Sequence, residues 1–139
     1  MTDQNERSGA TSVLVVDDDA AATDALRALL ERDGFLVEVA NQLGTAIARC
    51  DSTLPDVLIS DVCLPDGDGC ELARKLRGDV RFKGVMVAVT GYVDRRTDKR
   101  LKSAGFDARF AKPLNFADFR AYLNDAKPTP VDPSATPAS

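Results

Sequence analysis

The sequence predicts a doubly wound α/β fold, in which a five-stranded parallel sheet of order 2-1-3-4-5 is flanked by five helices. Short runs of β-branched and aliphatic residues alternate five times with segments of helical periodicity, and the connections between them are short. Right-handed crossovers in such a chain place helices on both faces of the sheet. The carboxyl ends of the first and third strands then flank a binding crevice.

Each expected strand is a short apolar run that ends at a polar residue or a turn. The expected strands cover residues 13–16, 35–40, 56–60, 85–89 and 106–111. The run at residues 13–16 is typical of strands that are buried on both faces.

Each expected helix follows a strand and has recognisable ends. The expected helices cover residues 20–33, 41–50, 68–77, 92–103 and 115–126, with N-caps at Asp19, Asn41, Asp68 and Asn115. Asp68 and Glu71 have the spacing of a capping box. Gly34, Gly78 and Gly105 end the first, third and fourth helices. The fourth helix is rich in charge and poor in apolar residues, so most of it is expected to face water.

The chain is predicted to form one domain, at residues 12–126, between two segments that do not fold. Residues 1–11 are a polar leader without the apolar stretch of a secretory signal, and residues 127–139 are rich in Pro, Ser, Thr and Ala. Nothing approaches the roughly 18 apolar residues of a membrane span. We expect a cytoplasmic protein that does not insert into membranes.

Composition excludes several classes of function. The net charge of −4 and the pI near 4.8 argue against direct binding of nucleic acid, which requires basic surfaces. The absence of histidine excludes Ser-His and Cys-His nucleophiles, histidine metal ligands and a phosphohistidine donor. Cys50, Cys63 and Cys70 lack metal-ligand spacing and are expected to be reduced thiols, the first and last of them packed in the interior.

Acidic residues follow the two strands whose ends flank the crevice. Asp17 and Asp18 follow the first strand, and Asp61 follows the third. Three carboxylates within about 5 Å of one another repel by several kcal/mol per pair. The cluster therefore needs either a shared proton or a hard divalent cation, and an all-oxygen site with room for water suits Mg²⁺.

The fourth and fifth strands deliver a hydroxyl, Thr90, and a cation, Lys112, to the same edge. Taken alone, Asp17 and Asp18 are more simply read as helix-capping acids, and Asp61 as a turn residue. The joint arrangement changes this interpretation. It supplies what phosphoryl transfer to a carboxylate requires, which is mostly positioning and charge neutralisation.

These residues give the chain a resemblance to receiver domains of the two-component response-regulator family, including the single-domain chemotaxis regulators. The resemblance covers about residues 12–125. It rests on Asp17-Asp18, on Asp61-x-x-x-Pro65-x-x-Asp68-Gly69, on Thr90-Gly91 and on Lys112-Pro113, which occur in the family's order and spacing.

The resemblance implies that Asp61 accepts a phosphoryl group from a phosphohistidine on a sensor histidine kinase or a histidine phosphotransfer protein. Asp18 would bind Mg²⁺, or Mn²⁺, directly, Asp17 mainly through water, and Cys63 through its backbone carbonyl. Thr90 and Lys112 would contact the phosphoryl oxygens, and the bond from Lys112 to Pro113 would be cis. Such a domain catalyses only its own phosphorylation and dephosphorylation, and signals by contact with a protein target that the sequence does not identify.

Three positions depart from the family pattern or tune it. Cys63 and Tyr92 occupy positions that, in this family, control the attack of water on the phosphoaspartate. Neither side chain has an acid or amide group that positions a water well. We therefore expect a slow to moderate loss of the phosphoryl group. Arg109 stands where many members have an aromatic switch residue. Burial of an unpaired guanidinium costs several kcal/mol, more than a typical coupling of about 1–3 kcal/mol. We therefore expect Arg109 to stay solvated beside the fourth helix, while Phe110 points to the opposite face.

Alternative functions remain open. A single-domain regulator or phosphate shuttle is the first expectation, and a receiver from a hybrid sensor kinase or a larger regulator is the second. A Mg²⁺-dependent aspartyl-phosphate phosphatase of the haloacid-dehalogenase type is more remote, because Cys63 replaces the second acid that it needs. A flavodoxin-like binder of FMN is disfavoured, because the acids after the first strand would repel its phosphate.

Overall fold

The computed structural model describes residues 10–91 and 94–126. Most of the predicted leader, the whole of the predicted tail and Tyr92 lie outside these ranges. The expectations about them therefore stay predictions.

The main sheet has five parallel strands in the order β2-β1-β3-β6-β7. Its strands are β1 (Ser12–Val16), β2 (Leu36–Ala40), β3 (Val57–Asp61), β6 (Val85–Thr90) and β7 (Ala108–Ala111). In chain order this is the predicted arrangement 2-1-3-4-5, which is confirmed. Strand β3 lies at the centre of the sheet, between β1 and β6.

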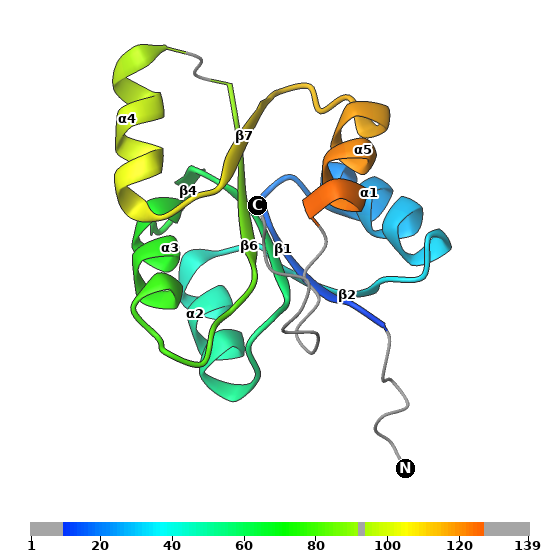
Figure 1. Ribbon diagram of the computed structural model, residues 1–139, viewed down its shortest axis with the longest axis horizontal. Coiled ribbons are helices and arrows are strands. Elements are labelled where there is room, and N and C mark those ends of the chain that lie inside the picture. The colour runs from blue at the N-terminus through cyan, green and yellow to red at the C-terminus, as the bar shows by residue number, and fades with distance from the viewer. Residues whose placement is uncertain (1–9, 92–93, 127–139) are drawn as a thin grey trace.

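Helices cover both faces of the sheet (Figure 1). They are α1 (Ala20–Arg32), α2 (Leu43–Ser52), α3 (Gly69–Arg77), α4 (Arg95–Ala104) and α5 (Phe116–Ala126). Helices α1 and α5 lie on one face, and α2, α3 and α4 lie on the other. None of the helices in the described ranges is both long enough and apolar enough to span a bilayer.

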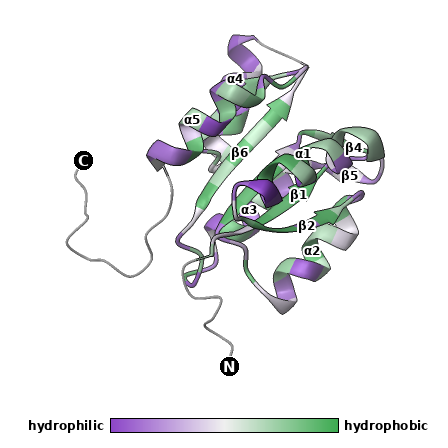
Figure 2. Ribbon diagram, turned by 90° about the vertical axis from the view of Figure 1, so that its right-hand side faces the viewer, coloured by the Kyte–Doolittle hydropathy of each residue, from purple (hydrophilic) through white to green (hydrophobic). Residues whose placement is uncertain are grey.

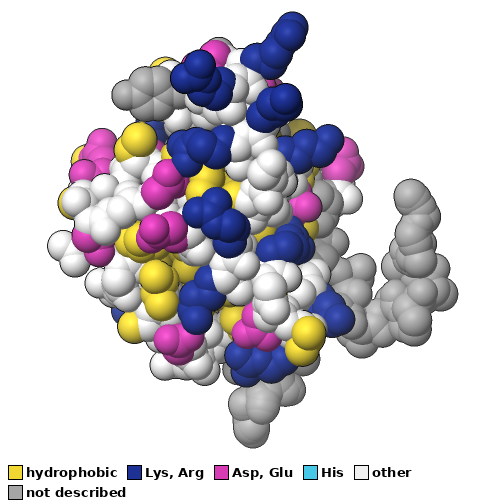
Figure 3. All heavy atoms as spheres, turned by 90° about the vertical axis from the view of Figure 1, so that its left-hand side faces the viewer, with side chains coloured by type: hydrophobic (Ala, Val, Ile, Leu, Met, Phe, Trp, Pro, Cys, Tyr) yellow, Lys and Arg dark blue, Asp and Glu magenta, His cyan; other side chains and the backbone are white. Residues whose placement is uncertain are grey.

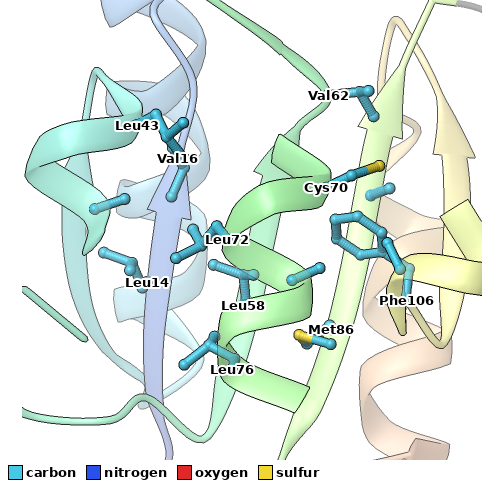
Figure 4. Close-up of a cluster of buried hydrophobic side chains, with 14 of the residues drawn as sticks. Leu14, Val16, Leu43, Leu58, Val62, Cys70, Leu72, Leu76, Met86 and Phe106 are labelled. Carbon is cyan, nitrogen blue, oxygen red and sulfur yellow. The ribbon is translucent and has the colours of Figure 1, made fainter. Parts of the chain in front are cut away.

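Each face of the sheet packs its own apolar cluster, because successive side chains of a strand point to opposite faces. In β1, Leu14 and Val16 point to the α2–α4 side, and Val13 and Val15 point to the α1–α5 side. The first cluster also includes Leu58, Leu72, Leu76, Met86 and Phe106 (Figure 4). Figure 2 shows hydrophobic strands between helices of mixed hydropathy, as expected for a buried parallel sheet.

Several predicted helix ends are confirmed by their hydrogen bonds. The Asp19 carboxylate accepts a bond from the backbone N–H of Ala22 at 3.1 Å, and the Asp68 carboxylate accepts one from that of Cys70 at 2.8 Å. These bonds satisfy donors that the first turn of a helix leaves unpaired. Gly105 ends α4 with a φ of 108°, a conformation that glycine adopts without steric cost.

Helix α4 and strand β7 each begin two or three residues later than predicted, and α2 is shifted by two residues. Helix α4 begins at Arg95 and not at residue 92, because Asp94 acts as its N-cap and accepts a bond from the backbone N–H of Thr97 at 2.7 Å. Strand β7 begins at Ala108 and not at residue 106. Asp107 turns the chain there, with its backbone N–H donating to the Met86 carbonyl and its carboxylate accepting from the Met86 N–H.

The N-terminus of α2 is capped from a distant loop. Asn41 is not the cap that the sequence predicts, since Gln42 occupies that position and its side chain makes no capping bond. The carboxylate of Asp66 instead accepts bonds from the backbone N–H groups of Leu43, at 2.7 Å, and Gly44, at 2.9 Å. Asp66 belongs to the loop between β3 and α3, so this cap joins two separate parts of the chain.

That loop also contains a small antiparallel hairpin. Its strands are β4 (Cys63–Leu64) and β5 (Gly67–Asp68). The hairpin comes directly after the end of β3. It therefore fixes the course of the chain next to Asp61.

Candidate functional site

The predicted site residues lie at the carboxyl ends of four parallel strands. Asp17 follows β1, Asp61 ends β3, Thr90 ends β6 and Lys112 follows β7. Parallel strands bring these ends to one edge of the sheet, where ligands bind in open α/β folds. The sheet order therefore accounts for their proximity.

Asp17, Asp18 and Asp61 form an acidic cluster. Each contributes a carboxylate oxygen, and the three oxygens lie within 4.8 Å of one another. Asp17 and Asp61 are buried, with 9% and 8% of their surface exposed, and Asp18 is exposed. Because two of the acids are buried and the third is exposed, the cluster is open to solvent on one side.

Lys112 partly neutralises this cluster. Its Nζ lies 2.9 Å from Oδ2 of Asp61 and 3.2 Å from Oδ2 of Asp17. Burial lowers the pKa of Lys112, but the bonds to Asp61 and Asp17 outweigh it and hold the pKa above its ordinary value. The peptide bond from Lys112 to Pro113 is cis, as predicted, and the Lys112 backbone N–H donates to the Thr90 carbonyl at 3.0 Å.

Asp17 is held in place by its neighbours. Its Oδ1 accepts a bond from the backbone N–H of Asp19 at 3.0 Å, and its carbonyl accepts one from the Asn41 side-chain amide at 2.9 Å. The contribution of Asn41 was missed, because a polar residue before a helix is normally interpreted as its cap. Its position directly after β2, the neighbour of β1, is the one signal that pointed toward the site.

Asp61 lies against a closely packed loop. Its Oδ1 accepts a bond from the backbone N–H of Cys63 at 3.3 Å. A Cβ atom at Gly69 would lie 2.3 Å from the Asp61 carbonyl oxygen, so only glycine fits there. Gly69 thus lets the backbone of this loop lie close to the end of β3.

The remaining predicted residues surround the cluster. Thr90 is buried, with 1% of its surface exposed, and a Cβ atom at the following Gly91 would meet no atom within 4 Å. The Cys63 side chain is exposed, whereas burial raises the pKa of the Cys50 and Cys70 thiols to about 11. The role of the Cys63 carbonyl as a metal ligand stays a prediction, and Tyr92 lies outside the described residues.

A cavity of about 440 Å³ opens beside the acidic cluster. Apolar residues of α1 and of the β7–α5 loop form much of its lining, and Asp17, Asp61 and Lys112 contribute to it. A larger cavity, of about 970 Å³, lies at β2 and the end of α2 and includes none of the predicted site residues. The smaller cavity is therefore the one that belongs to the site.

Arg109 lies beside α4, as predicted, but it is paired with an acid and not fully solvated. Its Nε and its terminal nitrogen contact the two carboxylate oxygens of Asp98 in α4, at 2.7 and 3.1 Å. The side chain is 29% exposed, so it is neither buried nor fully solvated. Phe110 points to the other face, where it packs against Phe119 and Tyr122 of α5, as predicted.

The charges of the site match a divalent cation. Three carboxylates face one ammonium group, which leaves two negative charges in a partly buried space. The ligand atoms are all oxygen, and the exposed Asp18 leaves one side accessible to water, which is the environment that Mg²⁺ prefers. With such a cation in place, the cluster would attract an anionic phosphoryl group.

Comparison with known proteins gives a consistent result. Residues 13–124 match the family model of the response regulator receiver domain. The chain is 36% identical over 117 residues to the KDP operon transcriptional regulatory protein KdpE of Escherichia coli (strain K12), covering 84% of this chain and 51% of that protein. It is 34% identical over 104 residues to an uncharacterized 14.6 kDa protein of Leptolyngbya boryana, covering 74% of this chain and 79% of that protein.

Solved structures agree with these relatives. A CheY-like response regulator receiver domain protein from Methanospirillum hungatei superposes with a TM-score of 0.78 and 31% identity, covering 84% of this chain and 93% of that chain. The chain spans about half the length of KdpE, so the similarity to that protein is limited to one part of it.

Proposed function

The chain belongs to the response regulator receiver domain family, and from this premise we propose that it takes a phosphoryl group onto Asp61 from a phosphohistidine of a partner protein. The phosphohistidine must lie outside these 139 residues, because they contain no histidine. A sensor histidine kinase or a histidine phosphotransfer protein has the required group. In the transfer, a P–O bond forms at the Asp61 carboxylate and the P–N bond of the donor breaks, with the electron pair returning to the imidazole.

The contact between Lys112 and Asp61 carries this proposal. Asp61 ends the central strand, and the Lys112 ammonium lies 2.9 Å from its Oδ2. An incoming phosphoryl group brings negative charge to that position, and a flexible cation already placed there can move to its oxygens. Thr90, at the end of the neighbouring strand, would donate a hydrogen bond from its hydroxyl to another phosphoryl oxygen.

The acidic cluster supports a role for Mg²⁺ in the same reaction. Asp18, Asp17 and Asp61 would hold the ion together with the Cys63 carbonyl, and Mn²⁺ fits the same oxygen donors. A bound divalent ion supplies charge neutralisation between the acids and the phosphoryl oxygens. The residues of the chain position the acceptor, and Lys112 and Thr90 orient the group that is transferred.

The proposed output is contact with another protein, and the proposed compartment is the cytoplasm. All three cysteines are free thiols in the structure, which fits a reducing compartment. Direct binding of DNA is not part of the proposal, because the net charge is −4.

Phosphorylation by small donors tests the proposal. The wild-type protein and the Asp61→Asn variant are incubated with Mg²⁺ and either acetyl phosphate or phosphoramidate, whose P–N bond resembles that of phosphohistidine. Intact-protein mass spectrometry should show the added phosphoryl mass in wild type and none in the variant. Asp24→Asn, which removes an exposed acid of α1, is the matched control and should react like wild type. Labelling of Asp61→Asn at the wild-type rate would rule out Asp61 as the acceptor.

Two alternative functions would also use Asp61 or an aspartyl phosphate. The chain can act as the receiver of a hybrid sensor kinase or of a larger regulator, which the partial coverage of KdpE favours. A phosphatase of the haloacid-dehalogenase type would also form an aspartyl phosphate, but Cys63 stands where it needs a second acid. Turnover of p-nitrophenyl phosphate by the purified protein would favour that alternative.

A further inference from the structure

Positive charge is concentrated on one side of the molecule. Residues 69–105, which include α3 and α4, contain ten Lys and Arg against four Asp and Glu, and the rest of the chain contains eight against eighteen. The first part therefore has a formal charge of +6, and the remainder one of −10. Figure 3, which views the molecule from the side of α2, α3 and α4, shows many basic side chains gathered there.

Five of these cations form what we call the basic face. Its members are exposed and belong to two helices that pack together, namely Arg74 of α3 and Arg95, Arg96, Lys99 and Lys102 of α4. Within residues 10–91 and 94–126, none of the five forms an ion pair with an acid. The apolar side of α4, with Leu101 and Ala104, is buried, so these cations point outward.

Other cations nearby are paired, and they fix the position of α4. Arg100 contacts Asp68 at the start of α3, with 2.5 Å between nitrogen and oxygen. On the opposite side of α4, Asp98 pairs with Arg109 of β7. The cations that face neighbouring elements thus have partners, whereas those of the basic face are presented to solvent by an anchored helix.

The basic face works against the stability of its own helix. Arg95 and Lys99, like Arg96 and Arg100, are like charges four residues apart, an arrangement that destabilises helices. Arg95 and Arg96 also lie in the first turn, where the helix dipole disfavours cations. A solvated surface needs charge, but it does not need charge of one sign. The N-cap Asp94 and the first-turn acid Asp98 offset only part of this cost. Within the described residues the basic face itself has no ion-pair partner, which favours a partner of opposite charge.

We propose that the basic face binds an acidic segment of a partner protein. The size of the face favours a protein segment over a nucleic acid. Helix α4 has ten residues and is roughly 15 Å long, and the acids Asp94, Asp68 and Glu71 border the face at the starts of the two helices. The net charge of −4 disfavours binding of a long phosphate backbone, whereas a short acidic segment matches the length of α4. The proposal does not depend on phosphorylation of Asp61.

The test removes two positive charges from each of two surfaces and compares the effects on binding. Arg96→Gln with Lys99→Gln neutralises the basic face, and Arg27→Gln with Arg32→Gln removes the same charge from α1, on the other side of the molecule (Figure 1). The probe is a fluorescent Glu-rich helical peptide as long as α4, titrated with the full chain at physiological salt. We expect the first variant to weaken binding about threefold to tenfold, in the range of two exposed ion pairs, and the second to leave it unchanged.

Two further measurements separate binding from folding and from phosphorylation. The Arg96→Gln, Lys99→Gln variant should be at least as stable as wild type to heat, because it loses like-charge repulsion. Asp61→Asn should bind the peptide like wild type, so failure of the proposed phosphorylation would leave this result intact. Equal weakening by both double variants, or no binding by wild type, would overturn the proposal. Tighter binding of a single-stranded oligonucleotide than of the peptide, through the same cations, would overturn the choice of partner.

Discussion

Arg109 and Asp98 join β7 to α4 through two parallel bonds between a guanidinium and a carboxylate. The two side chains are 29% and 44% exposed. The expectation that Arg109 does not turn inward was based on the cost of burying an unpaired cation. The structure supplies a different reason, since inward movement would also separate Arg109 from Asp98 and leave that acid without its partner.

We predict a modest coupling between these two residues. Arg109→Ala and Asp98→Ala should each lower the free energy of unfolding, and the double-mutant cycle should give an interaction of about 0.2–1 kcal/mol, because both side chains are partly exposed. Urea denaturation of the four proteins measures it. Phosphorylation by acetyl phosphate should be unchanged in Arg109→Ala. A coupling of about 3 kcal/mol would instead indicate a pair that behaves as fully buried.

At the scale of elements, the loop after Asp61 is the most tightly fitted connection of the site. Gly69 lies where a Cβ atom would overlap the Asp61 carbonyl oxygen, at 2.3 Å, while Gly91 after β6 has open space around it. Both glycines belong to the motifs that carried the family resemblance. Packing within the chain requires glycine at position 69, but it does not require glycine at position 91.

We predict opposite outcomes for alanine at these two glycines. Gly69→Ala should destabilise the protein by about 1–3 kcal/mol, because backbone atoms must move to accept the methyl group. Gly91→Ala should change the free energy of unfolding by less than about 0.5 kcal/mol, as at other sites without close contacts. Thermal denaturation monitored by circular dichroism compares them, each serving as the other's control. Equal losses of stability would show that Gly91 is also constrained.

The elements that sequence could predict are those whose signals are local. Five strands, five helices and their sheet order follow from periodicity, and the Asp19 and Asp68 caps follow from residue type. The contacts that could not be predicted join residues far apart in the chain, such as Asp66 with the start of α2 and Arg109 with α4. The members of the site could be predicted because strand ends converge, but the bond of Asn41 to Asp17 could not.

For the whole molecule, the acidic cluster makes stability depend on divalent cations. Asp61 lies close to Asp17 and Asp18 only in the folded state, so its repulsion with them destabilises that state alone. A cation that binds this state and not the unfolded chain stabilises it by mass action. The same acids therefore lower stability without the cation and raise it in its presence.

We predict that Mg²⁺ raises the melting temperature of wild type and has little effect on Asp18→Ala. At a concentration of 100 times the dissociation constant, the gain should be about 2.7 kcal/mol. With a chelator present, Asp18→Ala should be at least as stable as wild type, because one repelling charge is gone. Differential scanning calorimetry measures both conditions, with Asp24→Asn as the control. An equal Mg²⁺ effect in Asp18→Ala and wild type would contradict the assignment of Asp18.

The cap that Asp66 provides for α2 has a consequence for how the molecule opens. Helix α2 has no side-chain cap of its own, so the N–H groups of Leu43 and Gly44 have their acceptor only when the loop after β3 is in its folded position. Loss of that loop would expose the first turn of α2 to water and favour its fraying. Amide hydrogens at the start of α2 should then exchange with solvent together with those of the loop that contains Asp66, as one cooperative unit, although the two segments are more than twenty residues apart.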